Sequence, residues 1–361
     1  MTKLKICYFP GRESSYSRTR VILKGMKDAG VEVLDCSYPE RKFFRYIAGF
    51  WKFLLYKGKS DIVFIGFFGH FIMPVVKLFT GKKIIFDAFV SVYQTMVFDR
   101  KVFRPGTFPA RLARLIDRVS CRLADAVILD TDQHIEYFVR EYNLKRDRFY
   151  RIPASADDSV MFPRPGTDDG DFTVHFHGEF HPLHGVGYIL EAAAMLPDVK
   201  FQIVGRRKDL LLCLKKGERL ESKNVTFIPP VSYERLAGYM AGASVCLGIF
   251  GNTRKAGLVI PNKVYEALAM GKPVITADTQ AARELLTDGE NALLCGRADP
   301  KSLAEAIKKL KDDKHLRERI AENGQRIFKE KCSPLVIGRK ISAIAERISR
   351  DITCGYSIRS F

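Results

Sequence analysis

The chain has 361 residues, of which 47% are hydrophobic and 28% charged, and it is too long for one ordinary hydrophobic core. A net charge of +18 favours anionic partners such as lipid surfaces, nucleic acid or anionic substrates. Because its eight Cys form no C-x-x-C pair, we expect neither a disulfide framework nor a zinc site. We expect the thiols to be reduced, as they are in the cytoplasm.

Strands and helices alternate through the first half of the chain. A strand at 4–9 leads through Gly11 into a helix at 17–29. A strand–Gly–helix start can hold a phosphate, although an ordinary strand–helix turn has the same sequence pattern. Further strands are predicted at 31–34, 61–66, 82–87 and 124–131, and helices at 110–123 and 132–142. We expect no signal peptide and no segment that spans a bilayer.

Residues 41–57 interleave basic and aromatic side chains and contain the only Trp of the chain. As a helix, the segment places Phe43, Ile47, Phe50 and Leu54 on one side. Such a helix suits the headgroup boundary of an anionic membrane. It is equally consistent with a core helix that has basic ends.

A second strand–helix series follows a segment of Pro, Gly and Asp at 163–171, which is typical of a linker. Strands are predicted at 172–176, 201–205, 224–228, 244–249 and 274–276, with helices at 186–196, 233–241, 261–270 and 300–310. We therefore predict an α/β protein with two doubly wound parallel sheets facing a cleft. The expected domains are 1–165, 166–335 and a last segment, 336–361, whose helix returns to the first domain.

Residues 257–276 combine a loop, a helix start and a strand, the arrangement in which α/β proteins bind phosphates. Pro261 can occupy the first turn of a helix, and Gly271 followed by Pro273 ends it. Glu266 lies near the helix start, where a buried carboxylate could accept two ribose hydroxyls; a solvated helix residue is the alternative.

The run from Pro261 to Val274 resembles the donor-site helix of the retaining glycosyltransferase family four, which has the GT-B fold. The segments 150–157 and 283–294 are similar to further turns of that family. The resemblance implies transfer from a nucleotide diphosphate sugar without metal or other cofactor. The C-terminal half would hold the donor and the N-terminal half the acceptor.

Three positions depart from the family pattern. Leu258 stands where the first Glu of the E-x7-E motif would fall, while Glu266 matches the second. Glu179 and His184 stand where Arg and Lys hold the donor diphosphate. A neutral His supplies a hydrogen-bond donor but no full charge.

The resemblance also assigns roles to single residues. Glu266 would bind the ribose, and Lys263 and Arg206 would supply charge at the phosphates. Asp87, at the end of its strand, would be catalytic and would face the cleft near the donor sugar. The alternative for Asp87 is a loop acid that caps the next segment. The remaining donor-site candidates are Gly11, Gly178, His184, Pro261 and Asn262. The spacing of the His residues at 175–184 matches no zinc pattern, so no metal is expected.

We therefore interpret the chain as a glycosyltransferase of glycan or polysaccharide synthesis. Its acceptor would be a saccharide or lipid-linked, and the protein would be cytoplasmic and peripheral on the inner face of the cell membrane. One alternative is a catalytically idle GT-B subunit, and another is a nucleotide-sugar epimerase. A nucleic-acid binder rests on the net charge alone, without a motif, and no nucleic acid is expected as partner.

Overall fold

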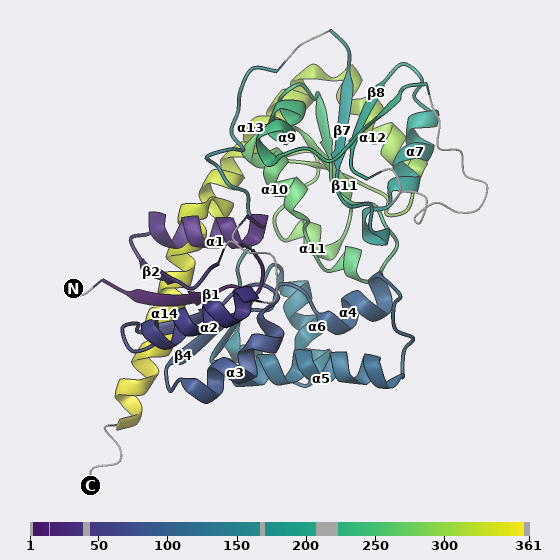
Figure 1. Cartoon of the computed structure of the whole chain (residues 1–361). Coiled ribbons are helices and arrows are strands. Elements are labelled where there is room, and N and C mark those ends of the chain that lie inside the picture. Colours follow the sequence, from purple (N-terminus) through teal and green to yellow (C-terminus); the bar gives the residue numbers. More distant parts are fainter. Residues whose placement is uncertain (1–2, 14, 39–43, 167–169, 207–222, 357–361) are drawn as a thin grey trace. The chain divides into compact units, whose positions relative to one another are not determined.

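The computed structural model describes residues 3–13, 15–38, 44–166, 170–206 and 223–356 (Figure 1). The chain divides into two compact units. Unit 1 contains the residues up to Val97, Lys101–Ser155 and the chain from Ser333, and unit 2 contains Phe98–Arg100 and Ala156–Cys332. The described residues of the predicted linker, 163–166 and 170–171, thus lie within unit 2, and 167–169 lie outside the described residues.

Unit 1 is built on a six-stranded parallel sheet in the order β2-β1-β3-β4-β5-β6. Its strands are β1 (Lys5–Phe9), β2 (Glu32–Asp35), β3 (Ile62–Ile65), β4 (Lys83–Asp87), β5 (Ala126–Leu129) and β6 (Phe149–Arg151). Its α-helices are α1 (Ser17–Asp28), α2 (Phe44–Tyr56), α3 (Ile72–Phe79), α4 (Val92–Gln94), α5 (Phe108–Leu123), α6 (Asp132–Tyr142) and α14 (Pro334–Tyr356). Charged residues stand only at the ends of these strands, and the residues between them are largely apolar, because helices cover both faces of a parallel sheet.

The long helix α14 packs along α1 in unit 1 (Figure 1). Ile337, Ile341 and Ile344 join Ile22 and Met26 in one buried apolar cluster. The two helices approach so closely that a Cβ at Gly338 would collide with the backbone carbonyl of Gly25, so the contact requires glycine there. The last helix of the chain therefore completes the core of the first unit.

Unit 2 contains the other parallel sheet, in the order β12-β11-β10-β7-β8-β9. Its strands are β7 (Thr173–His177), β8 (Lys200–Val204), β9 (Val225–Ile228), β10 (Val245–Leu247), β11 (Val274–Ala277) and β12 (Leu293–Cys295). Its α-helices are α7 (Val186–Ala194), α9 (Tyr233–Ala241), α10 (Asn262–Ala269), α11 (Gln280–Arg283), α12 (Pro300–Asp312) and α13 (Lys314–Ile327). The two six-stranded sheets confirm the predicted α/β class.

Single turns and short wide-turn segments join these elements. They are the 3-10 turns Gly69–Phe71, Arg146–Arg148, Pro182–His184 and Lys255–Gly257 and the π-type turns Thr95–Asp99 and Phe328–Cys332. Within the residues described, no helix is both long enough and apolar enough to cross a bilayer.

Candidate functional site

The predicted donor-site residues of unit 2 gather where the order of its strands reverses. From β7 the chain adds β8 and β9 on one side and then crosses to β10 on the other. Ligands of open α/β sheets bind beyond the carboxyl ends of the strands at such a switch point. His177 is the last residue of β7, and Gly178 follows it at this edge.

Glu266 is buried on α10 and binds the end of β7. Its Oε2 lies 2.8 Å from His177 Nε2, and His177 Nδ1 lies 3.0 Å from His175 Nε2. Because a carboxylate only accepts hydrogen bonds, His177 Nε2 carries a proton toward Glu266. The second hydrogen bond joins His177 Nδ1 to His175 Nε2. The two hydrogen bonds fix the orientation of both imidazole rings and of the carboxylate.

His175, at the inner end of this series of hydrogen bonds, lies in apolar surroundings. Burial, assisted by the nearby His177, holds the pKa of His175 well below its ordinary value. Its Nδ1 has no hydrogen-bond partner among the described residues. His175 therefore stays neutral and serves as a buried support for His177.

The Lys263 ammonium lies on the same helix, one turn before Glu266, and is buried. It sits 5.0 Å from the centroid of the Phe176 ring, and no carboxylate of the described residues forms an ion pair with it. Burial lowers the pKa of Lys263 to about 7, and the Glu266 charge only partly opposes that shift. A buried ammonium without a counter-charge is unfavourable, so this position favours an anionic ligand.

His184 closes the site from the loop after β7. Its side chain is buried, and burial together with the positive charge of Lys263 keeps its pKa well below the ordinary value. A Cβ at Gly178 would lie 2.8 Å from His184 Cε1 and 3.5 Å from Lys263 Nζ. Gly178 is thus required for the close approach of these two side chains to the end of β7.

The other candidates of unit 2 lie at the margin. Pro261 is the N-cap of α10, just outside the helix that was expected to include it, and Asn262 is its first residue; both are half-buried. Arg206 is exposed just after β8 and has no ion-pair partner among the described residues. Glu179 points to solvent, where it pairs with His181 at 3.0 Å, so it brings no carboxylate to Lys263. Leu258 is half-buried.

Asp87 does not lie on an open face of unit 1 as the sequence suggested. It is fully buried and forms a two-pronged ion pair with Arg18, with distances of 3.0 and 3.2 Å. Arg18 also donates to the carbonyl oxygens of Ile152 and Pro153. Burial raises the pKa of the Asp87 carboxyl, and the guanidinium opposes this rise. The position is that of a structural ion pair.

Gly11 of unit 1 follows β1, also at a strand-order reversal. A Cβ on it would collide with the backbone of Phe67 and Gly69. The need for glycine there is thus explained by the packing of two loops within unit 1. The phosphate contact expected at Gly11 has no support in this geometry.

Sequence reasoning missed the pairing of His177 with Glu266. The signal was present: His175 and His177 alternate in an otherwise apolar strand, and the second comes directly before a Gly. In the described part of the chain, no three His, Cys, Asp or Glu residues are arranged to hold a metal ion.

Known proteins resemble this chain in sequence and in fold. Residues 157–327 match the family described as "Glycosyl transferases group 1". Alpha-D-kanosaminyltransferase of Streptomyces kanamyceticus is 27% identical over 279 residues, 72% of this chain and 68% of that protein. D-inositol 3-phosphate glycosyltransferase of a Nocardioides species is 26% identical over 245 residues. The match covers 60% of this chain and only 52% of that relative.

Solved structures share the whole architecture. Sucrose-phosphate synthase (tll1590) from Thermosynechococcus elongatus aligns with a TM-score of 0.73 at 16% identity, covering 96% of this chain and 99% of that one. Anabaena Alr3699/HepE in complex with UDP-glucose aligns with a TM-score of 0.71 at 16% identity, covering 96% and 100%. The fold that these structures share with the chain is the GT-B fold of glycosyltransferases. The match to the group 1 glycosyltransferase family lies within unit 2 and covers most of it.

Proposed function

We propose that unit 2 binds a nucleotide diphosphate sugar at the carboxyl end of β7 and that the protein transfers the sugar, a hexose, with retention of its anomeric configuration. The observation that carries this proposal is the pair of buried charges on α10. Glu266 is held by His177 at 2.8 Å, and Lys263 is buried without an ion-pair partner among the described residues. A ribose and a diphosphate offer matching hydroxyls and negative charge.

The proposed chemistry rests on positioning and on charge. Glu266 would accept hydrogen bonds from two ribose hydroxyls, with His177 keeping its orientation. Lys263 and the first backbone N–H groups of α10 would stabilise the negative charge that develops on the leaving diphosphate. Arg206 would add charge at the margin, and Pro261 and Asn262 would lie near the sugar. The proposal needs no metal and no cofactor beyond the donor.

The Anabaena structure named above was solved with UDP-glucose, and two relatives are named as transferases. This supports a nucleotide sugar as the donor class. For the acceptor we propose a saccharide or a lipid-linked saccharide of glycan synthesis. A protein with a net charge of +18 that works on a lipid-linked acceptor would lie on the inner face of the cell membrane.

A second candidate function, a nucleotide-sugar-binding subunit without transferase activity, is favoured by three positions. Leu258 replaces the first motif Glu, Glu179 is exposed, and His184 is buried and neutral. These substitutions would weaken contacts to the sugar and the diphosphate. They leave the Glu266–His177 pair unchanged.

The test is a calorimetric screen of nucleotides and nucleotide sugars, followed by turnover of the bound donor with saccharide and lipid-linked acceptors. We expect one nucleotide sugar to bind and to be consumed only with an acceptor, and NMR of the product to show a retained anomer. Binding without turnover on any acceptor would favour the inactive subunit. Failure of every nucleotide sugar to bind would refute the donor site.

A further inference from the structure

An unusual concentration of exposed apolar side chains lies on three helices of unit 1. Among the described residues, only Phe162 and Met195 are exposed large hydrophobic residues of unit 2. By contrast, α2, α3 with the residue before it, and α5 carry ten: Ile47, Trp51, Leu55, Phe71, Val75, Leu78, Phe79, Phe108, Leu112 and Leu115. Soluble proteins rarely gather exposed apolar residues in this way unless the surface binds something.

The three helices cover the same face of the sheet. From β2 onward each crossover to β3, β4 and β5 moves in one direction across the sheet, and right-handed crossovers place their helices on one side. Phe50 of α2 contacts Phe79 of α3 edge-on, with ring centroids 5.2 Å apart. Ser120 of α5 donates to the carbonyl of His70, just before α3. Figure 1 shows α2, α3 and α5 as neighbours.

On each helix the exposed residues form a stripe opposite the buried face. In α2, Ile47, Trp51 and Leu55 recur every four residues, while Gly49 and Phe53 face inward. Phe108, Leu112 and Leu115 repeat the pattern on α5 with helical spacing. Phe50 and Leu54, which the sequence placed on one side with Ile47, are half-buried, so the exposed stripe runs beside the predicted one. Arg41, Lys42 and Phe43 lie outside the described residues.

The charge on these helices has one sign at the surface. Together α2, α3 and α5 contain seven Lys or Arg, and their one acidic residue, Asp117, is buried. The basic residues are Arg45, Lys52, Lys77, Arg111, Arg114, Arg118 and Arg122. An apolar stripe flanked by cations complements an anionic bilayer, in which acyl chains lie beneath phosphate groups.

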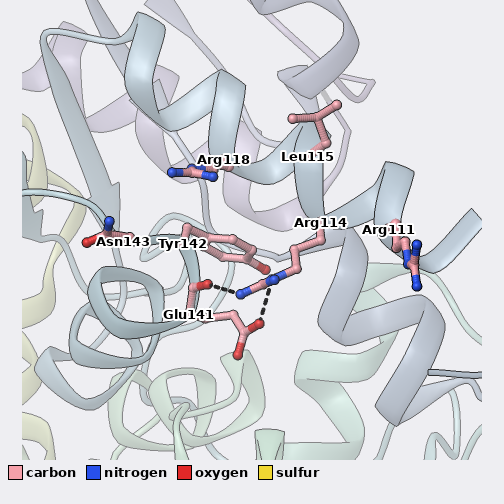
Figure 2. A pocket seen from close by; sticks show the side chains of 7 residues that line it. All are labelled: Arg111, Arg114, Leu115, Arg118, Glu141, Tyr142 and Asn143. Atoms are coloured by element: carbon pink, nitrogen blue, oxygen red, sulfur yellow. Dashed lines mark hydrogen bonds and ion pairs between the residues drawn. The ribbon is translucent and has the colours of Figure 1, made fainter. Parts of the chain in front are cut away.

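A cavity of about 230 Å³ opens beside the α5 stripe (Figure 2). Arg111, Arg114, Leu115 and Arg118 form one wall, and the end of α6 with Glu141 and Tyr142 forms the other. Arg114 is neutralised by Glu141 at 2.8 Å, whereas Arg111 and Arg118 form no ion pair within the described residues. The buried Nε of Arg118 has no hydrogen-bond partner there. The cavity therefore combines aliphatic walls with two guanidinium groups available to a phosphate.

We infer that α2, α3 and α5 form a docking surface for an anionic phospholipid bilayer, and that the Arg111–Arg118 cavity takes the phosphate of one lipid headgroup. Trp51, Leu55 and Leu78 insert at the headgroup boundary, and the basic residues contact lipid phosphates. This inference deepens the proposed function by naming its membrane contact. It rests on that function only for the acceptor, because the binding itself needs no sugar donor.

Trp51 makes the test direct, because it is the only Trp of the chain and lies on the proposed surface, 64% exposed. The full chain is mixed with vesicles of phosphatidylcholine, alone or with phosphatidylglycerol, at low and high salt. We expect sedimentation with the anionic vesicles only, weakened by salt, and a blue shift of the Trp51 emission with quenching by lipids brominated on their acyl chains.

Variants locate the contact. Leu55→Glu and Leu78→Glu should each weaken vesicle binding by about tenfold or more, the effect of withdrawing one buried Leu from lipid. Arg111→Glu with Arg118→Glu should weaken it at low salt. Phe162→Glu and Met195→Glu, at the exposed apolar positions of unit 2, are the matched controls and should bind normally. Circular dichroism and donor calorimetry on each variant check that fold and donor site are intact.

Three outcomes would overturn the inference. They are sedimentation without a change in Trp51 emission, equal binding to neutral vesicles, and no binding to anionic vesicles at low salt. Loss of membrane binding with normal donor binding would refute this surface and leave the proposed function standing. Failure of donor binding with normal vesicle binding would do the reverse.

Discussion

At the scale of single residues, Glu266 depends on a partner far away in the sequence, since His177 lies 89 positions earlier. We expect Glu266→Gln to weaken binding of the nucleotide sugar by about 1.5–3 kcal/mol, the range for hydrogen bonds to a charged group. Titration calorimetry measures the change. Glu318→Gln, which removes a charge from the exposed pair with Lys314 on α13, is the matched control. Unchanged affinity in the Glu266 variant would exclude the ribose contact.

Lys263 should couple donor binding to protons. Its pKa of about 7 means that at pH 8 the free protein holds this side chain mostly neutral. A bound diphosphate stabilises the charged form and raises the pKa, so binding at pH 8 should take up close to one proton. Affinity should therefore fall as the pH rises above 7.

Calorimetry in two buffers of different ionisation enthalpy measures this proton uptake. The ligand should be the nucleotide sugar, because the terminal phosphate of a free nucleotide has a pKa of about 6 and would itself exchange protons. Lys263→Ala should bind more weakly and take up no proton. Arg206→Ala, at an exposed position, should lower affinity without removing the uptake. Equal proton uptake in the Lys263 variant would contradict the assignment.

Asp87 illustrates how an acid at a strand end can be structural. Removing its charge in Asp87→Asn leaves Arg18 buried without a counter-charge, so the free energy of unfolding should drop by about 3–5 kcal/mol. Urea denaturation measures this. Asp28→Asn, which breaks the partly exposed pair with Lys24, should cost less than about 1 kcal/mol. A stable but inactive Asp87 variant would restore its catalytic interpretation.

At the scale of helices and strands, the contact of α1 with α14 depends on two glycines. A methyl group at Gly338 meets the Gly25 carbonyl, so Gly338→Ala should force the helices apart and lower the free energy of unfolding by roughly 1–3 kcal/mol. Gly81→Ala, whose Cβ would meet open space, is the control and should change little. Thermal and urea unfolding of both variants give the comparison; equal stability would refute the close approach.

At the scale of the whole molecule, unit 1 is assembled from both ends of the chain. Ile337, Ile341, Ile344 and Ile348 of α14 are buried in its core. At about 1.5–3 kcal/mol for each buried Ile, their loss removes on the order of 10 kcal/mol, comparable to the stability of a whole domain. A chain that ends at Cys332 should therefore lose the structure of unit 1 and keep that of unit 2.

Hydrogen exchange followed by mass spectrometry can resolve the two units. Protection should be lost in β1, β3 and β4 and retained in β7, β8 and β10. A chain that ends at Arg350 keeps all four Ile and should retain both sets. Persisting protection of β1 in the shorter chain would show that α14 is dispensable for the core.

Local pattern was sufficient for much of this molecule. Apolar strands alternating with helices predict two parallel sheets, because periodicity and turn residues act within a few positions. The same locality placed Lys263 and Glu266 on one helix near its start, and the resemblance of 261–274 to a donor-site helix led to the glycosyltransferase class. The sequence also showed that residues 44–56 are amphipathic, but it did not show which face of the helix is buried.

Tertiary structure decided what depends on distant partners. Arg18 and Asp87 are 69 positions apart in the sequence, and only the folded structure shows that their side chains form a buried ion pair. His177 meets Glu266, and Arg111 lies beside the end of α6, for the same reason. Burial and the sign of a pKa shift are properties of the surrounding packed atoms. Motifs therefore predicted the donor helix, while the contacts of its carboxylate and its lysine became visible only in the fold.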